Sequence, residues 1–339
     1  MTVWTQRFAA LSLILSSTTF WGVGLGQVEP SDATPNEASL SRAPIIDMHL
    51  HAAGAAQWVR APNPVTGELA PETAEQHMRE CLAIMERYNI IGVVDGPLEV
   101  LEAWRAEAPG RVIASLALNR PGLGSFDAPL PRLDVLREMY RDGRLRAMGE
   151  VGAQYEGLSA SDMAYEPYFA LAEELGIPVG IHTGTSFPQT ALRRPNFRVA
   201  LGNPILLEDL LVRHPRLRVY IMHGGEPWTR ETVLMMHQFP QLYMDVAVIN
   251  WIGGPQGLPR FHEFLRQMLA EGFGERILFG TDQMLWPEAI ELAIDAIQTA
   301  DFLSNEQKRD ILYNNAARFL RLSDEEIARH HQMSTRARP

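Results

Sequence analysis

Two histidines separated by one residue end an apolar run, Ile45-Ile46-Asp47-Met48-His49-Leu50-His51. Side chains alternate between the two faces of a β-strand, so positions i and i+2 point to the same side. We therefore expect His49 and His51 to present their imidazoles next to each other. Neutral imidazole is the commonest protein ligand for zinc and similar metals. The pair predicts part of a metal site, provided that other segments bring further ligands to the same place.

The chain has enough apolar residues to build a scaffold that gathers such ligands. It has 339 residues, of which 46% are hydrophobic, and an α/β barrel of about 250 residues forms one domain. Short runs rich in β-branched residues alternate with segments of helical apolar spacing. The expected strands are Ile45–His49, Ile91–Asp95, Val112–Leu116, Ala147–Val151, Pro178–His182, Arg218–His223, Leu242–Val246 and Arg276–Gly280. The expected helices include Glu72–Tyr88, Asp134–Arg141, Tyr165–Leu175, Pro204–His214, Thr229–Phe239, Pro259–Glu271 and Pro287–Ala300.

Eight strands that alternate with helices predict a parallel sheet, most economically a closed (β/α)8 TIM barrel. The alternative is an open, doubly wound sheet. That fold would need a glycine-rich turn after the first strand, but His49-Leu50-His51-Ala52 stands there instead. The TIM barrel is therefore the predicted fold of a catalytic domain at residues 44–322.

Ligand-type side chains follow the carboxyl ends of five expected strands, which is where TIM barrels build their active sites. These residues are His49, His51, Glu150, His182, His223 and Asp282. A single histidine at a strand end is most often a hydrogen-bonded structural residue. Six such residues in one register together predict a metal site at the mouth of the barrel.

A divalent ion in that mouth would define the chemistry. With one coordination position open, it lowers the pKa of a water ligand from about 16 toward 7 and polarises a carbonyl group. Asp282 would take a proton from that water and pass it to the leaving group, and His223 would steady developing negative charge. Two roles are open for Glu150: it bridges two ions as a ligand, or it accepts the N–H of a ligand imidazole.

Motifs along the chain resemble those of the amidohydrolase superfamily, and within it the amidohydrolase-related branch of hydrolases and decarboxylases. They are Asp47-Met48-His49-Leu50-His51, Gly149-Glu150-Val151-Gly152, Gly180-Ile181-His182-Thr183-Gly184, His214-Pro215-Arg216-Leu217-Arg218 running into His223-Gly224-Gly225, Leu278-Phe279-Gly280-Thr281-Asp282, and Asn314-Asn315-Ala316-Ala317-Arg318-Phe319. The resemblance spans roughly residues 44–322. It implies that metal is bound by His49, His51, His182 and Asp282. It also implies that His223 binds a second metal or contacts substrate or water.

The expected function is hydrolysis of an amide, lactone or ester bond in a small organic substrate. A metal-dependent, non-oxidative decarboxylase of the same branch is the alternative, and an exported binding protein without turnover is a third hypothesis. Zinc is the expected metal. One ion is favoured because His49, His51, His182 and Asp282 already make a complete set with room for water, but two ions are possible if Glu150 bridges.

Further residues are weaker candidates for contact with substrate. Arg193 and Arg194 follow the fifth strand, and a guanidinium there would hold a substrate carboxylate if the loop overhangs the mouth. Trp228 either lines the pocket or simply opens the next helix. His77 and Cys81 stand four residues apart on a helix, and we interpret them as a packed helix face far from the mouth.

The ends of the chain differ in composition from the barrel. Residues 1–26 combine Arg7 with an uncharged apolar stretch and are expected to be a secretory signal, with an uncleaved membrane anchor as the alternative. Residues 27–43 are expected to be a linker, and residues 323–339 a polar, mobile tail. The mature protein is therefore expected to be periplasmic or secreted, without stable membrane association.

Charge and cysteine content limit the partners. The net charge is −11 and basic runs are short, which argues against a nucleic acid partner. Cys81 is the only cysteine, so an intrachain disulfide is impossible. The expected partner is a small-molecule substrate, and homo-oligomerisation is possible.

Overall fold

The computed structural model describes residues 43–119 and 129–333. The expected signal segment at residues 1–26 lies outside the described residues. The expected linker at residues 27–43 also lies outside them, except for Ala43. Within the described residues, none of the helices combines the length and apolar character that crossing a membrane requires. The predictions about export and cleavage therefore stay predictions.

Eight parallel strands form one sheet in sequence order, with each strand paired to the next. They are β1 (Ile45–His51), β2 (Ile90–Gly96), β3 (Val112–Leu118), β4 (Ala147–Val151), β5 (Val179–Ile181), β6 (Val219–Ile221), β7 (Leu242–Asp245) and β8 (Ile277–Leu278). Backbone hydrogen bonds from Met48 to Phe279 and from Asp282 to His49 join β1 to the segment that continues β8. The predicted TIM barrel is confirmed, because these bonds bring the two edge strands together.

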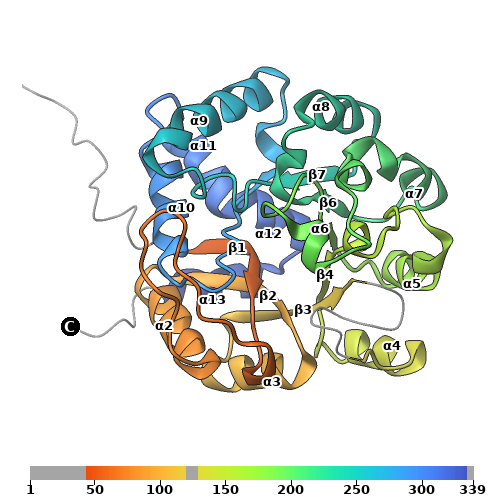
Figure 1. Ribbon diagram of the computed structural model, residues 1–339, viewed down its shortest axis with the longest axis horizontal. Coiled ribbons are helices and arrows are strands. Elements are labelled where there is room, and N and C mark those ends of the chain that lie inside the picture. Colours follow the sequence, from red (N-terminus) through yellow and green to blue (C-terminus); the bar gives the residue numbers. More distant parts are fainter. Residues whose placement is uncertain (1–42, 120–128, 334–339) are drawn as a thin grey trace, which may run out of the picture. The chain divides into compact units, whose positions relative to one another are not determined.

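Helices surround the strands on the outside (Figure 1). They are α2 (Ala74–Arg87), α3 (Leu98–Glu107), α4 (Leu133–Arg141), α5 (Glu166–Leu175), α6 (Thr190–Arg193), α7 (Glu208–Arg213), α8 (Thr229–Gln238), α9 (Gly254–Ala270), α10 (Ala289–Gln298), α11 (Asn305–Arg309), α12 (Asn315–Leu320) and α13 (Asp324–Met333). Helix α9 begins five residues earlier than the sequence predicted, with Pro259 tolerated inside its first turns.

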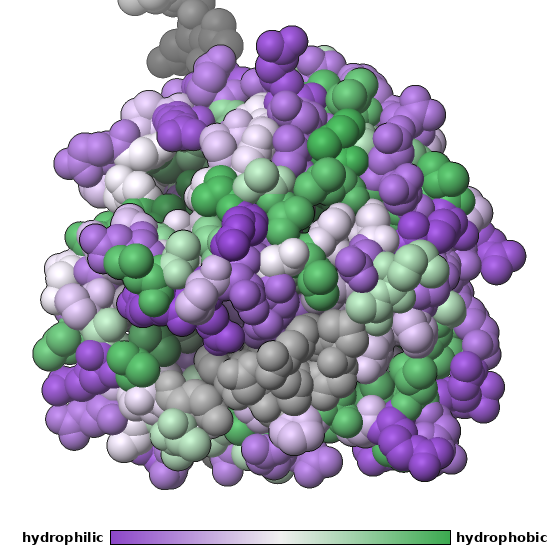
Figure 2. Space-filling model, turned by 45° about the vertical axis from the view of Figure 1, so that its right-hand side comes forward, coloured by the Kyte–Doolittle hydropathy of each residue, from purple (hydrophilic) through white to green (hydrophobic). Residues whose placement is uncertain are grey.

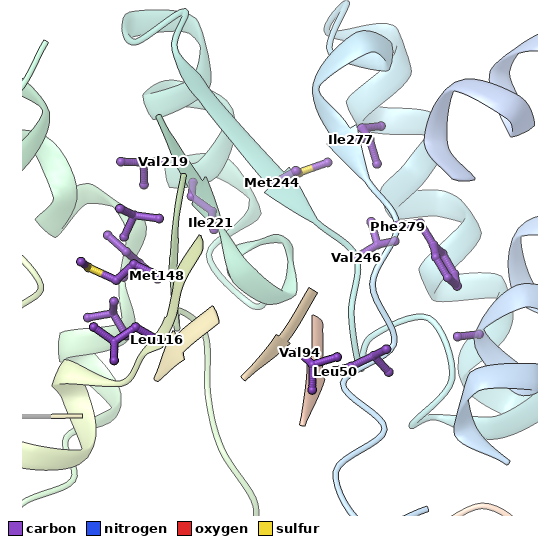
Figure 3. Close-up of a cluster of buried hydrophobic side chains, with 14 of the residues drawn as sticks. Leu50, Val94, Leu116, Met148, Val219, Ile221, Met244, Val246, Ile277 and Phe279 are labelled. Carbon is purple, nitrogen blue, oxygen red and sulfur yellow. The ribbon is translucent and has the colours of Figure 1, made fainter. Parts of the chain in front are cut away.

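Strand alternation divides the apolar residues into two layers. Outward-facing side chains such as Val94 and Met244 pack in a buried cluster between the strands and the helices (Figure 3). Inward-facing residues of the early strand positions, such as Ile46 and Ile91, form a second cluster with Phe319 of α12. This second cluster fills the amino-terminal end of the barrel, so the polar carboxyl-terminal end is left for the site.

The last four strands, β5 to β8, are shorter than the sequence predicted, and β5 and β6 stop one and two residues before His182 and His223. β6 ends at Ile221, and His223 has a left-handed backbone with φ 61°. The backbone N–H of His223 donates to the Asp245 carboxylate, and that of Thr281 donates to Asp47. These two N–H groups donate to carboxylates instead of pairing with a neighbouring strand, so the strands end there. The ligand side chains that follow are therefore carried by short loops at the mouth.

The expected mobile tail is wrong for residues 324–333, which form helix α13. The His330 side chain is buried and lies within hydrogen-bond distance of the Tyr313 hydroxyl, 3.0 Å away. The Asn89 amide donates to the backbone carbonyl of His330. The segment looked polar because His330 is the one buried residue among residues 324–333. Residues 334–339 lie outside the described residues.

The surface is mixed in character. On the face shown in Figure 2, hydrophilic residues in purple make up most of the outer surface, and hydrophobic residues in green lie between them. Large hydrophobic side chains that are more than half exposed come from separate elements: Val59, Leu69, Met163, Leu192, Val212 and Leu234. Scattered apolar residues of this kind are ordinary on soluble domains and do not by themselves indicate a docking face.

His77 and Cys81 pack inside α2 as predicted, although closer to the mouth than the sequence suggested. Both are fully buried, with His77 Nε2 3.4 Å from Cys81 Sγ. The Gln283 amide nitrogen lies 3.9 Å from Cys81 Sγ and also donates to the His51 carbonyl. A single side chain therefore separates the thiol from the backbone of a candidate ligand.

We expect His77 to make the metal-free protein sensitive to acid. Burial lowers the pKa of His77 to about 4 in the folded protein, whereas a histidine in the unfolded chain has its ordinary pKa of about 6.5. Between these two pH values the unfolded chain binds a proton at His77 and the folded protein does not. This contribution to stability is complete above pH 6.5 and is lost as the pH falls toward 4. Between pH 7 and pH 5 the loss should be about 2 kcal/mol. The free energy of unfolding, measured with denaturant at pH 7 and pH 5, should therefore fall less in His77→Gln than in the parent, by that amount. An equal fall in both proteins would contradict the burial argument.

Candidate metal centre

The end of β1 and the loop after β8 bring three predicted ligands together. Asp282 Oδ1 lies 2.9 Å from His51 Nε2 and 4.0 Å from His49 Nε2. The three side chains each offer one ligand atom within 4.8 Å of the others. His49 and Asp282 are buried, and His51 is partly exposed. This set is the first half of the centre.

Glu150 of β4 stands between this set and two further histidines. Its Oε2 atom lies 3.7 Å from His51 Nε2 and 4.0 Å from His49 Nε2. Its Oε1 atom lies 3.7 Å from His223 Nε2 and contacts His182 Nδ1. His182 Nδ1 and His223 Nε2 are 3.2 Å apart. The two oxygens of one carboxylate thus face two different groups of imidazoles.

Unpartnered atoms show that the centre fits a metal ion. His49 Nε2 and Asp282 Oδ1 are both buried without a hydrogen bond, since the 2.9 Å approach of His51 Nε2 to Asp282 Oδ1 is not aligned as one. Leaving buried polar atoms in this state is costly unless something else satisfies them. Ligand atoms held at about 2.0–2.2 Å around a tetrahedral ion lie about 3.3–3.6 Å from one another. The separations of 2.9–4.0 Å around Asp282 and Glu150 bracket that value. Imidazole and carboxylate donors suit zinc, manganese and related ions.

Two carboxylates, one from β2 and one from β7, orient the histidines of β1. Asp245 Oδ2 lies 3.1 Å from His49 Nδ1, and Asp95 Oδ1 contacts His51 Nδ1. A carboxylate at Nδ1 keeps the hydrogen there and leaves Nε2 free to bind metal. Neither acid was among the residues predicted for the site. The signal was strand alternation, because Asp95 and Asp245 each occupy the last inward position of an otherwise apolar strand.

We expect Asp95→Asn to weaken metal binding by about 10- to 100-fold, because loss of the charge behind His51 reduces the basicity of that imidazole. Asparagine is nearly isosteric and keeps an oxygen acceptor, so the fold should be retained. Competition with a fluorescent chelator measures the affinity. Asp134→Asn, an exposed pair with Arg132, is the control and should bind metal as the parent does. Equal affinity in Asp95→Asn would show that the carboxylate does not act through His51.

Side chains also hold the backbone around these ligands. The Gln283 amide accepts from the His51 N–H and donates to the His51 carbonyl, so it continues the pairing of β1 beyond the end of β8. Asp47 accepts hydrogen bonds from the backbone of His49 and from the backbone and hydroxyl of Thr281. These contacts fix the position of Asp282 relative to the end of β1.

Charges in the centre are strongly coupled. Burial opposes ionisation of Glu150 and Asp282, but nearby imidazoles outweigh it and hold the pKa of both carboxyls below the ordinary range. Burial likewise opposes charge on His49, but Asp282 and Asp245 raise the pKa of His49 to about 9. Without metal, protons therefore occupy imidazoles that a metal ion would bind, and metal uptake should release them.

A cavity of about 640 Å³ opens directly onto the centre. Its inner end is polar and includes His51, Glu150, His182, His223 and Asp282. Another part of its lining, from the loop after β7 and from α9, is mainly apolar and aromatic, with Arg260 beside it. Ligand pockets typically have this size and this combination of an apolar wall with a few convergent polar groups.

The weaker candidates have different positions. Arg194 is half-buried and lines a smaller neighbouring cavity together with His51 and Glu150. Arg193 is exposed and Trp228 is the amino-terminal cap residue of α8, and neither lines the two cavities at the centre. Sequence reasoning missed Tyr155, whose hydroxyl lies 3.3 Å from His182 Nε2 and faces both cavities.

Comparisons with solved structures show the same fold. A probable 2-pyrone-4,6-dicarboxylic acid hydrolase from Acinetobacter baumannii, with citric acid bound, aligns with a TM-score of 0.57 at 15% identity, covering 82% of this chain and 99% of that one. A dihydroxybenzoic acid decarboxylase from Polaromonas sp. JS666, with bound manganese, aligns with a TM-score of 0.55 at 15% identity, covering 84% and 99%. At these identities the likeness concerns the fold alone.

Sequence comparisons give the family. Protein fluG of Emericella nidulans is 23% identical over 163 residues, which is 44% of this chain and 18% of fluG, so the chain spans less than a fifth of that protein's length. The Amidohydrolase family profile matches residues 46–322. This range contains all six candidate ligands and all eight strands, apart from Ile45 at the start of β1. This match covers most of the chain, and the protein is therefore a member of the amidohydrolase family.

Proposed function

We propose that the protein is a metal-dependent hydrolase that cleaves an amide, ester or lactone bond in a small organic substrate. The observation that carries this proposal is the pair of unpartnered buried atoms, His49 Nε2 and Asp282 Oδ1, beside a cavity of substrate size. Family membership supports metal-dependent chemistry on a small molecule. His49, His51, His182, His223, Glu150 and Asp282 are the residues that would hold the metal.

The residues around the centre suit hydrolysis. A divalent ion held there supplies Lewis acidity to a substrate carbonyl and increases the acidity of a water molecule. Asp282, ionised and facing the cavity, accepts a proton from the attacking water and delivers it to the leaving group. Burial raises the pKa of Tyr155, so its hydroxyl stays protonated. Its O–H donates to Ser186 Oγ, and by turning from Ser186 it would donate to negative charge that develops on the substrate oxygen.

The two reactions differ in their need for a proton acceptor. Hydrolysis needs a group that takes a proton from water, and Asp282 lines the cavity where it can do so. Decarboxylation needs no such step, and a bound metal ion would offset the negative charges of Glu150 and Asp282, so a substrate carboxylate is compatible with the centre. The decarboxylase remains the second candidate, supported by the fold likeness to a dihydroxybenzoic acid decarboxylase.

We also propose that two ions bind, which differs from the preference for one ion that the sequence analysis reached. His182 Nε2 lies 3.2 Å from the Thr185 carbonyl, an acceptor that places the histidine hydrogen on Nε2. Nδ1 of His182 then faces Glu150 Oε1 and His223 Nε2 as a ligand atom. Oε2 of Glu150 faces the set around His51. Zinc is the metal that we propose, since the donors are imidazole nitrogens and carboxylate oxygens.

Chelation separates the functional hypotheses. The purified protein is stripped with a chelator, reloaded with zinc or manganese, and supplied with a panel of amides, esters, lactones and aromatic carboxylic acids. The expected result is release of a carboxylic acid that disappears on stripping and returns on reloading. Release of carbon dioxide would identify a decarboxylase instead. Failure to bind any divalent ion would favour a binding protein without turnover.

A further inference from the structure

The cavity system at the centre has two lobes that meet at the metal ligands. The larger lobe, of about 640 Å³, and the smaller lobe, of about 240 Å³, are both lined by His51, Glu150, Tyr155 and Met284. A substrate that occupied both lobes would have its middle beside the centre. The bond that is cleaved would then join two fragments of the substrate, one in each lobe.

The larger lobe has an extended apolar wall. Val248, Ile249 and Ile252 come from the loop after β7, and Phe261 and Phe264 come from α9. Phe261 and Phe264 are 3% and 6% exposed, so the little surface that they show faces this lobe rather than bulk solvent. Apolar surface in a cavity gains free energy when an apolar ligand group covers it.

A glycine lines this lobe. Gly257 lines the lobe in the first turns of α9, and a Cβ atom added there would meet nothing within 4 Å. The position therefore has room for a larger side chain at the edge of the lobe. Glycine is also a poor residue inside a helix, by about 0.5–1 kcal/mol relative to alanine, so packing of the helix does not account for it.

The smaller lobe carries one cation among the described residues that line it. That residue is Arg194, which lies beside Asn119 and Tyr155. Its NH1 atom is 3.8 Å from Glu156 Oε1, which is longer than a hydrogen bond. A guanidinium has five N–H donors and binds a carboxylate through two of them, so Arg194 can take an anionic ligand group.

We propose, resting on the hydrolase function above, that the substrate joins an apolar acyl group to a short fragment that carries a carboxylate. The acyl group occupies the larger lobe and the carboxylate contacts Arg194. Water adds its oxygen to the carbonyl carbon, the carbon–nitrogen or carbon–oxygen bond to the short fragment breaks, and that fragment leaves with the proton.

Straight-chain hydroxamates test the apolar lobe by binding alone. Calorimetry on the zinc-loaded protein with acetohydroxamate, hexanohydroxamate and octanohydroxamate should show affinity that rises about threefold to fourfold per methylene. Gly257→Leu should remove most of that gain, whereas Gln267→Leu, exposed on the same helix, should keep it. Equal affinity for the three compounds, or an unchanged gain in Gly257→Leu, would overturn the proposal. Acetohydroxamate that fails to bind would overturn the metal-dependent function as well.

A matched pair of substrates tests the carboxylate. N-octanoyl-alanine should be hydrolysed with a higher kcat/KM than its amide, N-octanoyl-alaninamide. Arg194→Met should lower kcat/KM for the acid by about 10- to 100-fold more than for the amide, which is the usual range for a charged hydrogen bond. Arg193→Met, the exposed neighbour, should preserve the preference for the acid. Equal use of acid and amide, or an equal loss on both in Arg194→Met, would overturn the proposal while leaving hydrolysis itself intact.

Discussion

Replacing Asp282 with asparagine should lower kcat by about 10²- to 10⁴-fold, because this carboxylate is both a metal ligand and the proton acceptor of the proposed reaction. Asp282 has a left-handed backbone with φ 49°. Asparagine tolerates that conformation better than alanine does, so the loss should come from chemistry rather than from misfolding. Steady-state kinetics at saturating metal measures the effect on kcat.

The control for this substitution is Asp142→Asn, an exposed carboxylate that pairs with Arg144 at the end of α4. It makes the same chemical change on the surface and should leave both kcat and the unfolding midpoint unchanged. An Asp282→Asn protein that binds metal and keeps full turnover would exclude Asp282 as the proton acceptor.

Replacing Glu150 with glutamine should reduce the metal content at saturation from two equivalents to one. Each oxygen of Glu150 faces a different group of imidazoles, and an amide offers only one strong oxygen donor and no negative charge. The second group, His182 and His223, would then lack the charge that holds a divalent ion. Elemental analysis after equilibration with zinc measures the ratio.

Two matched variants make this count interpretable. Glu174→Gln, an exposed pair with Arg137, should keep two equivalents. His223→Ala should fall to one equivalent, as Glu150→Gln does. A parent protein that saturates at one equivalent, with about 10- to 100-fold weaker binding in Glu150→Gln, would instead show that Glu150 only supports a ligand imidazole.

The sequence predicted the parts of the fold and site that depend on local periodicity. His49 and His51 share a face because of strand alternation, and the spacing of strands and helices was enough for the barrel. The positions of His182 and His223 at the mouth followed from the same reasoning. Strand length was predicted less well, because the backbone of His223 and Thr281 donates to carboxylates that are distant in the sequence.

Residues that act across the barrel were the ones that sequence reasoning missed. Asp245 lies 196 residues from His49, and nothing local to either residue indicates their contact. Tyr155 belongs to a short 3-10 helix after β4, and its hydroxyl approaches His182, which is 27 residues away in the sequence. Helix α13 was taken for a tail because its own composition is polar, whereas His330 is buried by Tyr313 from a neighbouring helix. Such contacts depend on tertiary packing rather than on pattern.

The central claim is that the six residues at the mouth form a metal centre, and anomalous diffraction from zinc-loaded crystals tests it most directly. We expect one anomalous peak within about 2.2 Å of His49 Nε2 and His51 Nε2, and a second at that distance from His182 Nδ1 and His223 Nε2, with Glu150 between them. Both peaks should vanish after chelation. Crystals that are saturated with zinc and show no anomalous peak at this mouth would contradict the assignment of these residues as metal ligands.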